Sequence, residues 1–153
     1  MALPNHQKSI IKGSSQAAAA LAVPGLFVPV VDVAGIAGIW ANMLIKVARN
    51  SGHELDFQFA TKMATSVATG FGAYVAGSKI LSYSIMFIPG IGIFGAMGMN
   101  SALNYIFTFK LGKIASGLFE RTSFDAADAA DIAKMLLLPL LSIPTMGDIR
   151  DMV

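Results

Sequence analysis

The sequence contains no cysteine and few charged residues. The absence of cysteine excludes disulfides, thiolate catalysis and zinc–thiolate sites. Charged residues make up 13% of the 153 residues, whereas ordinary soluble domains contain about 25%. Hydrophobic residues make up 55%, against about 45–50% in ordinary soluble domains. A domain of this size leaves much of its surface apolar at that composition. We therefore expect lipid, or further copies of the chain, to cover part of it.

Signals for catalysis, cofactors or nucleic acid are also lacking. The net charge is only +2 and the basic residues are spread out, which argues against nucleic-acid binding. Residues 90–95 match the pattern G-x-G-x-x-G, but they follow a proline rather than a strand, so we expect no nucleotide site. Residues 53–56 (HELD) lack the spacing of a zinc motif and instead suit a helix start. We expect no enzyme, no metal site and no cofactor.

The hydrophobic pattern predicts an all-α fold of about five helices arranged as hairpins. No segment shows the sustained alternation that is typical of strands. We expect one helical domain over residues 1–153, with a polar lead-in at 1–13, a helical core at 14–138 and a short tail at 139–153.

Three helices have recognisable boundaries. The first covers Val30–Arg49, has a wide apolar arc and stops at the following Asn-Ser-Gly. The second has helical character over Leu55–Met86, and acidic residues precede it. The third covers Asp125–Leu138 and ends at Pro139. Trp40 in the first helix fits either a membrane-interface anchor or a core tryptophan.

Two Pro-Gly turns are unusually apolar, although turns in soluble proteins are normally polar. Proline blocks helix continuation, and glycine permits positive φ. The turns recur 65 positions apart, and each leads to a long helix and then a Ser-Gly pair, which fits two similar hairpins or chance. We expect these turns to be membrane or assembly tips; they comprise Pro24, Gly25, Leu26, Phe27, Phe87, Ile88, Pro89, Gly90 and Ile91.

Small residues recur every three or four positions in the helical segments. Such ridges let helices approach closely. We expect close packing at Gly72, Ala76, Gly95, Gly98 and Ala102. A second, polar set would line a path if the chain forms a pore: Asp32, Asn42, Asn100 and Asn104.

Clean membrane spans are hard to draw, because Lys79 and Asp32 interrupt the apolar stretches. A span needs about 20 apolar residues. Lys79 lies about 14 Å from Ile88 along a helix and would have to snorkel, pair or face a polar interior. The pattern favours hairpins whose tips dip into the bilayer, or hairpins buried in an oligomer.

Several segments resemble a bacterial helical domain of unknown function. That domain occurs beside Era-like or immunity-related-type GTPase domains and in YcjF-type inner-membrane proteins. The matching pieces are Val23–Asp32, the helix end at Arg49–Gly52, Phe87–Gly92 and the Gly/Ala-rich helix reaching Glu120. The resemblance implies a membrane-associated module at the cytoplasmic face of the bacterial inner membrane. It also implies a GTPase partner, since the chain has no GTPase domain of its own.

The leading hypothesis is a non-enzymatic, membrane-associated protein that self-assembles as a homo-oligomer. Its role would be membrane scaffolding or remodelling, with the lipid bilayer and a GTPase as partners. Two alternatives stay open: a pore- or channel-forming subunit, and a soluble homo-oligomeric structural assembly.

Overall fold

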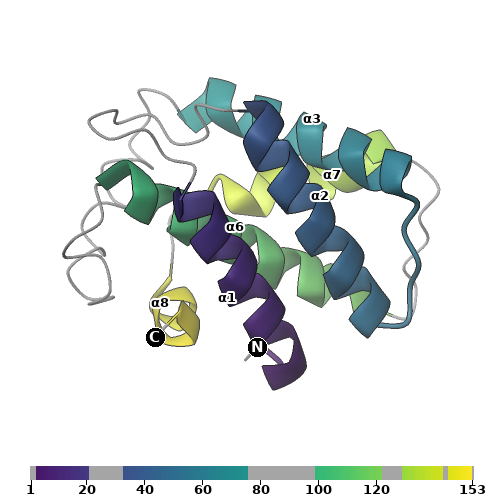
Figure 1. Ribbon diagram of the computed structural model, residues 1–153, viewed down its shortest axis with the longest axis horizontal. Coiled ribbons are helices and arrows are strands. Elements are labelled where there is room, and N and C mark those ends of the chain that lie inside the picture. Colours follow the sequence, from purple (N-terminus) through teal and green to yellow (C-terminus); the bar gives the residue numbers. More distant parts are fainter. Residues whose placement is uncertain (1–2, 21–32, 76–98, 122–128, 143–144, 153) are drawn as a thin grey trace.

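The fold is all-α over the residues that the computed structural model describes, which are 3–20, 33–75, 99–121, 129–142 and 145–152. The helices in these ranges are α1 (Asn5–Ala20), α2 (Val33–Asn50), α3 (Phe57–Val75), α6 (Met99–Phe119), α7 (Ala129–Leu140) and α8 (Met146–Met152) (Figure 1). Within those ranges there is no strand, so the predicted all-α class is confirmed there.

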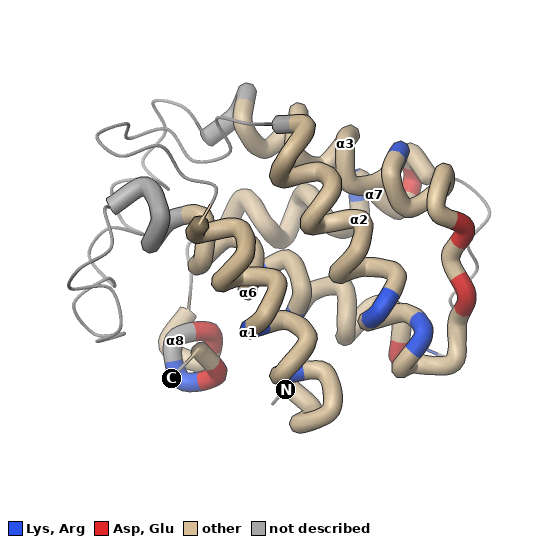
Figure 2. The backbone as a smooth tube through the Cα atoms, viewed as in Figure 1, with Lys and Arg blue, Asp and Glu red and all other residues tan. Residues whose placement is uncertain are grey.

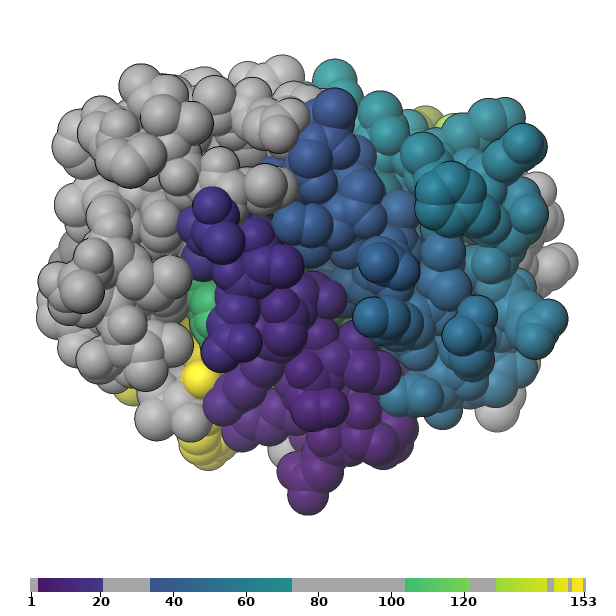
Figure 3. All heavy atoms as spheres, viewed as in Figure 1, coloured from purple at the N-terminus to yellow at the C-terminus, as the bar shows by residue number. Residues whose placement is uncertain are grey.

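The central helix is α6, which packs against α1, α2 and α7. Every residue from Asn104 to Gly112 is buried. A helix that is apolar all round must be covered on all sides. On the face drawn in Figure 3, α6 is visible only as a small green patch beside α1. Part of the apolar run that follows Pro89 is therefore protein core.

The junction between α2 and α3 agrees with the sequence signals. Gly52 has φ +86°, the left-handed conformation that glycine adopts most readily at a helix end. Asp56 then caps α3, because its Oδ2 accepts a hydrogen bond from the Phe59 amide at 3.3 Å. These local signals placed the end of α2 and the start of α3 within two residues of the observed positions.

The interpretation of residues 1–13 as a polar lead-in is wrong from Asn5 onward. α1 begins there and packs against α6 and α2. Its buried stripe includes Ile11, but also the polar Gln7 and Ser15. Gln7 Nε2 donates to the Val47 carbonyl at 3.1 Å, so a polar residue holds α1 against α2. A buried stripe that mixes polar and apolar residues gives only a weak helical pattern of hydrophobicity, so the sequence pattern did not indicate this part of the helix.

Three helix ends also differ from the expectations. α6 continues through Ser116 and Gly117, because Leu118 and Phe119 are buried beyond them. α7 includes Pro139 and ends at Leu140, and the amides of the next two residues, Leu141 and Ser142, still bond to its carbonyls. The expected tail contains α8.

Candidate functional site

Four helices meet at one end of the bundle, from which both predicted tips depart. α1 ends there at Ala20, α2 begins at Val33, α3 ends at Val75 and α6 begins at Met99 (Figure 1). The two segments that contain the Pro-Gly turns, 21–32 and 76–98, connect these helix ends. We call this region the uncharged end.

Direct contacts join the helices near the uncharged end. Asn104 Nδ2 in α6 donates to the Ala18 carbonyl in α1 at 3.1 Å. Trp40 Nε1 in α2 donates to Thr108 Oγ1 in α6 at 2.9 Å. The Trp40 ring also lies edge-on to Phe71 of α3, with 6.2 Å between ring centroids. These contacts fix the four helices as one bundle.

The four helices carry no charged residue for a considerable distance from this end. The first charge met is Lys12 in α1, Lys46 in α2, Lys62 in α3 and Lys110 in α6. At a rise of 1.5 Å per residue, these stretches measure about 12–20 Å. Half of a hydrocarbon core is about 15 Å. Figure 2 shows the described charges gathered away from this end, apart from those on α8 at its lower edge.

The exposed polar residues of α3 in this region are uncharged. Thr65, Ser66 and Thr69 are exposed on the stretch between Lys62 and Val75. A helical hydroxyl can donate to the carbonyl four residues back, as Thr61 Oγ1 does to the Phe57 carbonyl at 2.8 Å. Such internal bonding lowers the cost of leaving water.

All nine predicted tip residues lie outside the described residues: Pro24, Gly25, Leu26, Phe27, Phe87, Ile88, Pro89, Gly90 and Ile91. Of the expected packing residues, Ala76, Gly95 and Gly98 also lie outside them, and Ala102 is in α6. Gly72 is described in α3, and a methyl group there would meet no atom within 4 Å. Gly72 therefore provides no close approach in the described part of the chain.

Close approaches do occur at two glycines that the sequence did not single out. A Cβ at Gly112 would lie 2.7 Å from Ile11 Cγ2 and 3.0 Å from Met43 Sδ. A Cβ at Gly70 would lie 2.8 Å from Leu137 Cδ2. Gly112 thus lets α1 and α2 approach α6.

The residues expected to line a pore have different environments. Asn42 is exposed, whereas Asn104 is buried and bonded to α1. Asn100 lies in the first turn of α6, and Asp32 is outside the described residues.

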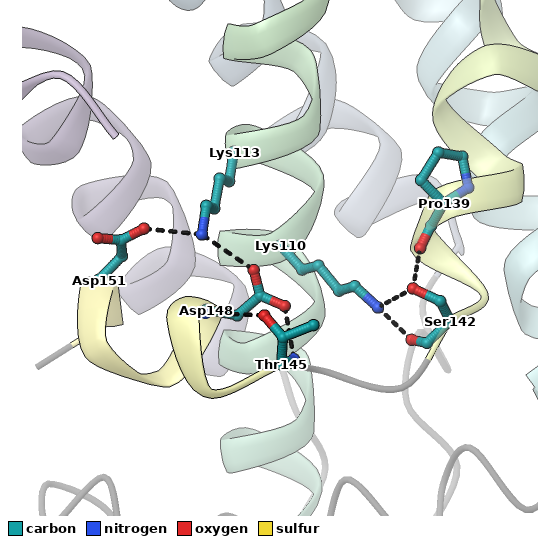
Figure 4. Close-up of polar contacts among 7 residues, drawn as sticks. All are labelled: Lys110, Lys113, Pro139, Ser142, Thr145, Asp148 and Asp151. Carbon is teal, nitrogen blue, oxygen red and sulfur yellow. Dashed lines mark hydrogen bonds and ion pairs between the residues drawn. The ribbon is translucent and has the colours of Figure 1, made fainter. Parts of the chain in front are cut away.

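A second polar cluster joins α6 to the C-terminal helices (Figure 4). Lys110 is only 4% exposed, and its Nζ donates to the carbonyl and to the hydroxyl of Ser142, the latter at 2.9 Å. The Ser142 hydroxyl in turn donates to the Pro139 carbonyl at 2.7 Å. Burial lowers the pKa of Lys110 to about 8, although the nearby charge of Asp148 opposes the shift.

The cluster also contains an ion-paired lysine, Lys113. Its Nζ lies 3.1 Å from Asp148 Oδ1 and 2.8 Å from Asp151 Oδ2, so α6 holds α8 by two carboxylates. Burial alone would lower the pKa of Lys113, but the hydrogen bonds to Asp151 and Asp148 outweigh it and raise the pKa.

Asp148 has a second role at the start of α8. The Thr145 amide donates to Asp148 Oδ2 at 2.8 Å, and the Asp148 amide donates to Thr145 Oγ1 at 3.2 Å. This is a capping box. Burial alone would raise the pKa of Asp148, but the Thr145 amide and Lys113 together lower it. The pattern T-x-x-D was readable in the sequence and would have revealed α8.

A lysine beside a serine raises the question of nucleophilic catalysis. Here the Ser142 hydroxyl donates to a carbonyl at the C-terminal end of α7, which is the negative end of a helix. Negative potential destabilises the oxyanion that acyl transfer requires. We therefore interpret Lys110 as a structural contact that holds Ser142, whose hydroxyl bonds the Pro139 carbonyl near the end of α7.

The Lys110 contact predicts a rise in stability at alkaline pH. The pKa is about 8 in the folded chain and 10.5 without burial, so between these values the unfolded chain holds more protons. The free energy of unfolding should then rise by about 1–2 kcal/mol between about pH 8 and pH 10. Tyr105, whose pKa burial raises, opposes this only near and above pH 10.

Lys110→Met should remove that rise, as measured by urea unfolding at several pH values. Lys134→Met is the control, because Lys134 is exposed on α7, and it should keep the rise. If the free energy of unfolding still rises with pH in Lys110→Met, then another titrating group causes the rise.

Comparison of the chain with protein-family models, with curated proteins and with solved structures finds no match. The resemblance noted from the sequence is therefore neither supported nor contradicted. Over the described ranges, no helix is both long enough and apolar enough to cross a membrane. In the same ranges, no three His, Cys, Asp or Glu side chains are grouped so as to hold a metal ion.

Proposed function

We propose that the protein is a membrane-associated, self-assembling helical scaffold that inserts its two Pro-Gly segments into one leaflet of a bilayer. The observation that carries this proposal is the uncharged end. Four helix ends converge there, and the charge-free stretches leading to it match about half the thickness of a hydrocarbon core.

The position of the two apolar segments strengthens the proposal. Residues 21–32 contain Asp32 as their one charged residue, and residues 76–98 contain Lys79. Because both segments leave the same end of the bundle, a single orientation can bring both to a membrane. If the two segments left opposite ends of the bundle, the protein would have to contact two membranes or cross one.

Self-assembly and a GTPase partner extend the same proposal. Copies inserted side by side in one leaflet would be concentrated in two dimensions, which promotes contacts between them. The resemblance to a domain that occurs beside GTPases supports a nucleotide-driven partner. Chemical cross-linking on vesicles would detect the assembly directly.

Replacing apolar tip residues with carboxylates should abolish membrane binding. In the double variant Phe27→Asp/Ile88→Asp, each carboxylate would have to enter the hydrocarbon, at a cost of about 2.5–3.5 kcal/mol. We expect the full chain to float with phosphatidylcholine vesicles in a density gradient, and the variant to partition more than about a hundredfold less.

Phe57→Asp is the matched control. Phe57 is apolar and 70% exposed, but it lies at the start of α3, the end of that helix away from the uncharged end. The control should float like the unchanged chain. Failure of the unchanged chain to float, together with its purification as a large lipid-free particle, would contradict the proposal and favour a soluble assembly.

A further inference from the structure

Three adjacent helices each present an exposed lysine as the charged residue nearest the uncharged end. These are Lys46 in α2, Lys62 in α3 and Lys134 in α7. α3 packs against both α2 and α7, so the lysines lie on three neighbouring helices (Figure 1). We call them the lysine collar.

The direction of α7 is set by its contacts with α3. α7 begins at Ala129, and in Figure 1 its start lies beside the first half of α3. Leu137 lies two turns after Ala129 on α7, and it contacts Gly70. Gly70 lies two turns after Lys62 on α3. The two helices therefore run in the same direction, and the part of α7 beyond Lys134 points toward the uncharged end.

Apolar and acidic residues lie on opposite sides of the collar. On α7, the exposed apolar side chains of Met135 (48%) and Leu138 (71%) follow Lys134 toward the uncharged end, and Asp131 lies one turn on the other side. On α3, Asp56 likewise lies on the far side of Lys62. On α7 the order from the uncharged end is thus apolar, basic, acidic, and along α3 it is uncharged, basic, acidic.

The acidic residues of α8 do not disturb this order. Asp148 and Asp151 are both paired with Lys113. Lys113 compensates one of these two negative charges inside the α6–α8 contact, and the charge of Lys110 also interacts with Asp148.

We propose that the lysine collar binds the phosphate groups of anionic lipids while the uncharged end enters the hydrocarbon, an inference that rests on the proposed function. An anionic leaflet has the complementary layers: hydrocarbon, then negatively charged phosphate, then water. Lys46 and Lys62 lie about 20 Å from the ends of α2 and α3 at the uncharged end, close to half the thickness of a bilayer with its headgroups, about 20–22 Å.

The lysine side chain suits this position. Its methylene stem can lie along apolar surface while the ammonium reaches the headgroups. Each lysine near an anionic surface should strengthen partitioning about fivefold at physiological salt, and three should strengthen it about a hundredfold. This gain depends on ionic strength, whereas insertion of apolar tips does not.

The test compares the full chain with two triple variants of equal charge. Lys46→Gln/Lys62→Gln/Lys134→Gln removes the collar. Lys8→Gln/Arg49→Gln/Arg121→Gln removes three basic residues that lie farther from the uncharged end along α1, α2 and α6. Each variant changes the net charge from +2 by three, to −1.

Binding is measured on vesicles of phosphatidylcholine alone and on vesicles that also contain phosphatidylglycerol, with far-UV circular dichroism and thermal unfolding to check folding. The collar variant should lose about a hundredfold on the anionic vesicles and nothing on the neutral ones. The control variant should lose much less.

Two results would overturn the inference while leaving the proposed function intact. One is equal binding of the unchanged chain to neutral and anionic vesicles. The other is an equal loss in the two triple variants, which would show that only net charge matters. If the chain with carboxylates at Phe27 and Ile88 still bound neutral vesicles, the proposed insertion itself would fail, and the collar with it.

Discussion

Trp40→Ala is expected to lower the free energy of unfolding by about 3–5 kcal/mol. Trp40 is completely buried where three helices meet. Its indole contacts Phe71 of α3 and donates to Thr108 of α6, and Phe71 lies 4.6 Å from the Phe107 ring, centroid to centroid. Truncation would leave a large cavity among rings that cannot all move to fill it.

Phe57→Ala is the control for this substitution. Phe57 is also a large aromatic residue, but it is 70% exposed, so its loss should change stability by about 0.5 kcal/mol or less. Denaturant unfolding of both variants, followed by circular dichroism, gives the comparison. A loss below about 1 kcal/mol in Trp40→Ala would contradict the packing of α2, α3 and α6 around this residue.

Gly112→Ala is expected to destabilise the chain by about 1–3 kcal/mol. The added methyl group would lie 2.7 and 2.8 Å from two side-chain carbons of Ile11. These carbons are attached directly to Cβ, so they cannot swing away without moving α1. Met43 Sδ, at 3.0 Å, closes the other side.

Gly117→Ala in the same helix should have the opposite effect. No atom lies within 4 Å of a Cβ at Gly117, and alanine is favoured over glycine in a helix interior by about 1 kcal/mol. Thermal unfolding of the two variants should therefore shift in opposite directions. Shifts of the same sign would show that α1 and α2 do not approach α6 at Gly112.

Helix boundaries were predictable wherever a few neighbouring residues set them. The end of α2 followed from Gly52, and the start of α3 followed from Asp56, because each forms a local cap. The start of α8 has an equally local signal in Thr145 and Asp148, which the hydrophobic pattern concealed.

The sequence was less informative where burial depends on a distant partner. The part of α1 before residue 14 was missed because the polar Gln7 is buried together with Ile11. Lys110 reads as the end of an uncharged run, yet it is buried because Ser142 lies against it. The candidate site was predicted only in part: the two apolar segments were singled out from the sequence, but the convergence of their flanking helices on one end depends on how the helices pack.

The sequence by itself determined the helical class, the scarcity of charge and the presence of two apolar segments that contain Pro-Gly. These properties depend on composition and on interactions within a few residues, so they can be read along the chain. The tertiary structure decided that four helices open toward one uncharged end, and that Lys46, Lys62 and Lys134 border it on three adjacent helices. Those facts depend on which helices pack together and in which direction, and that choice is made by long-range contacts such as Trp40 with Thr108 and Asn104 with Ala18.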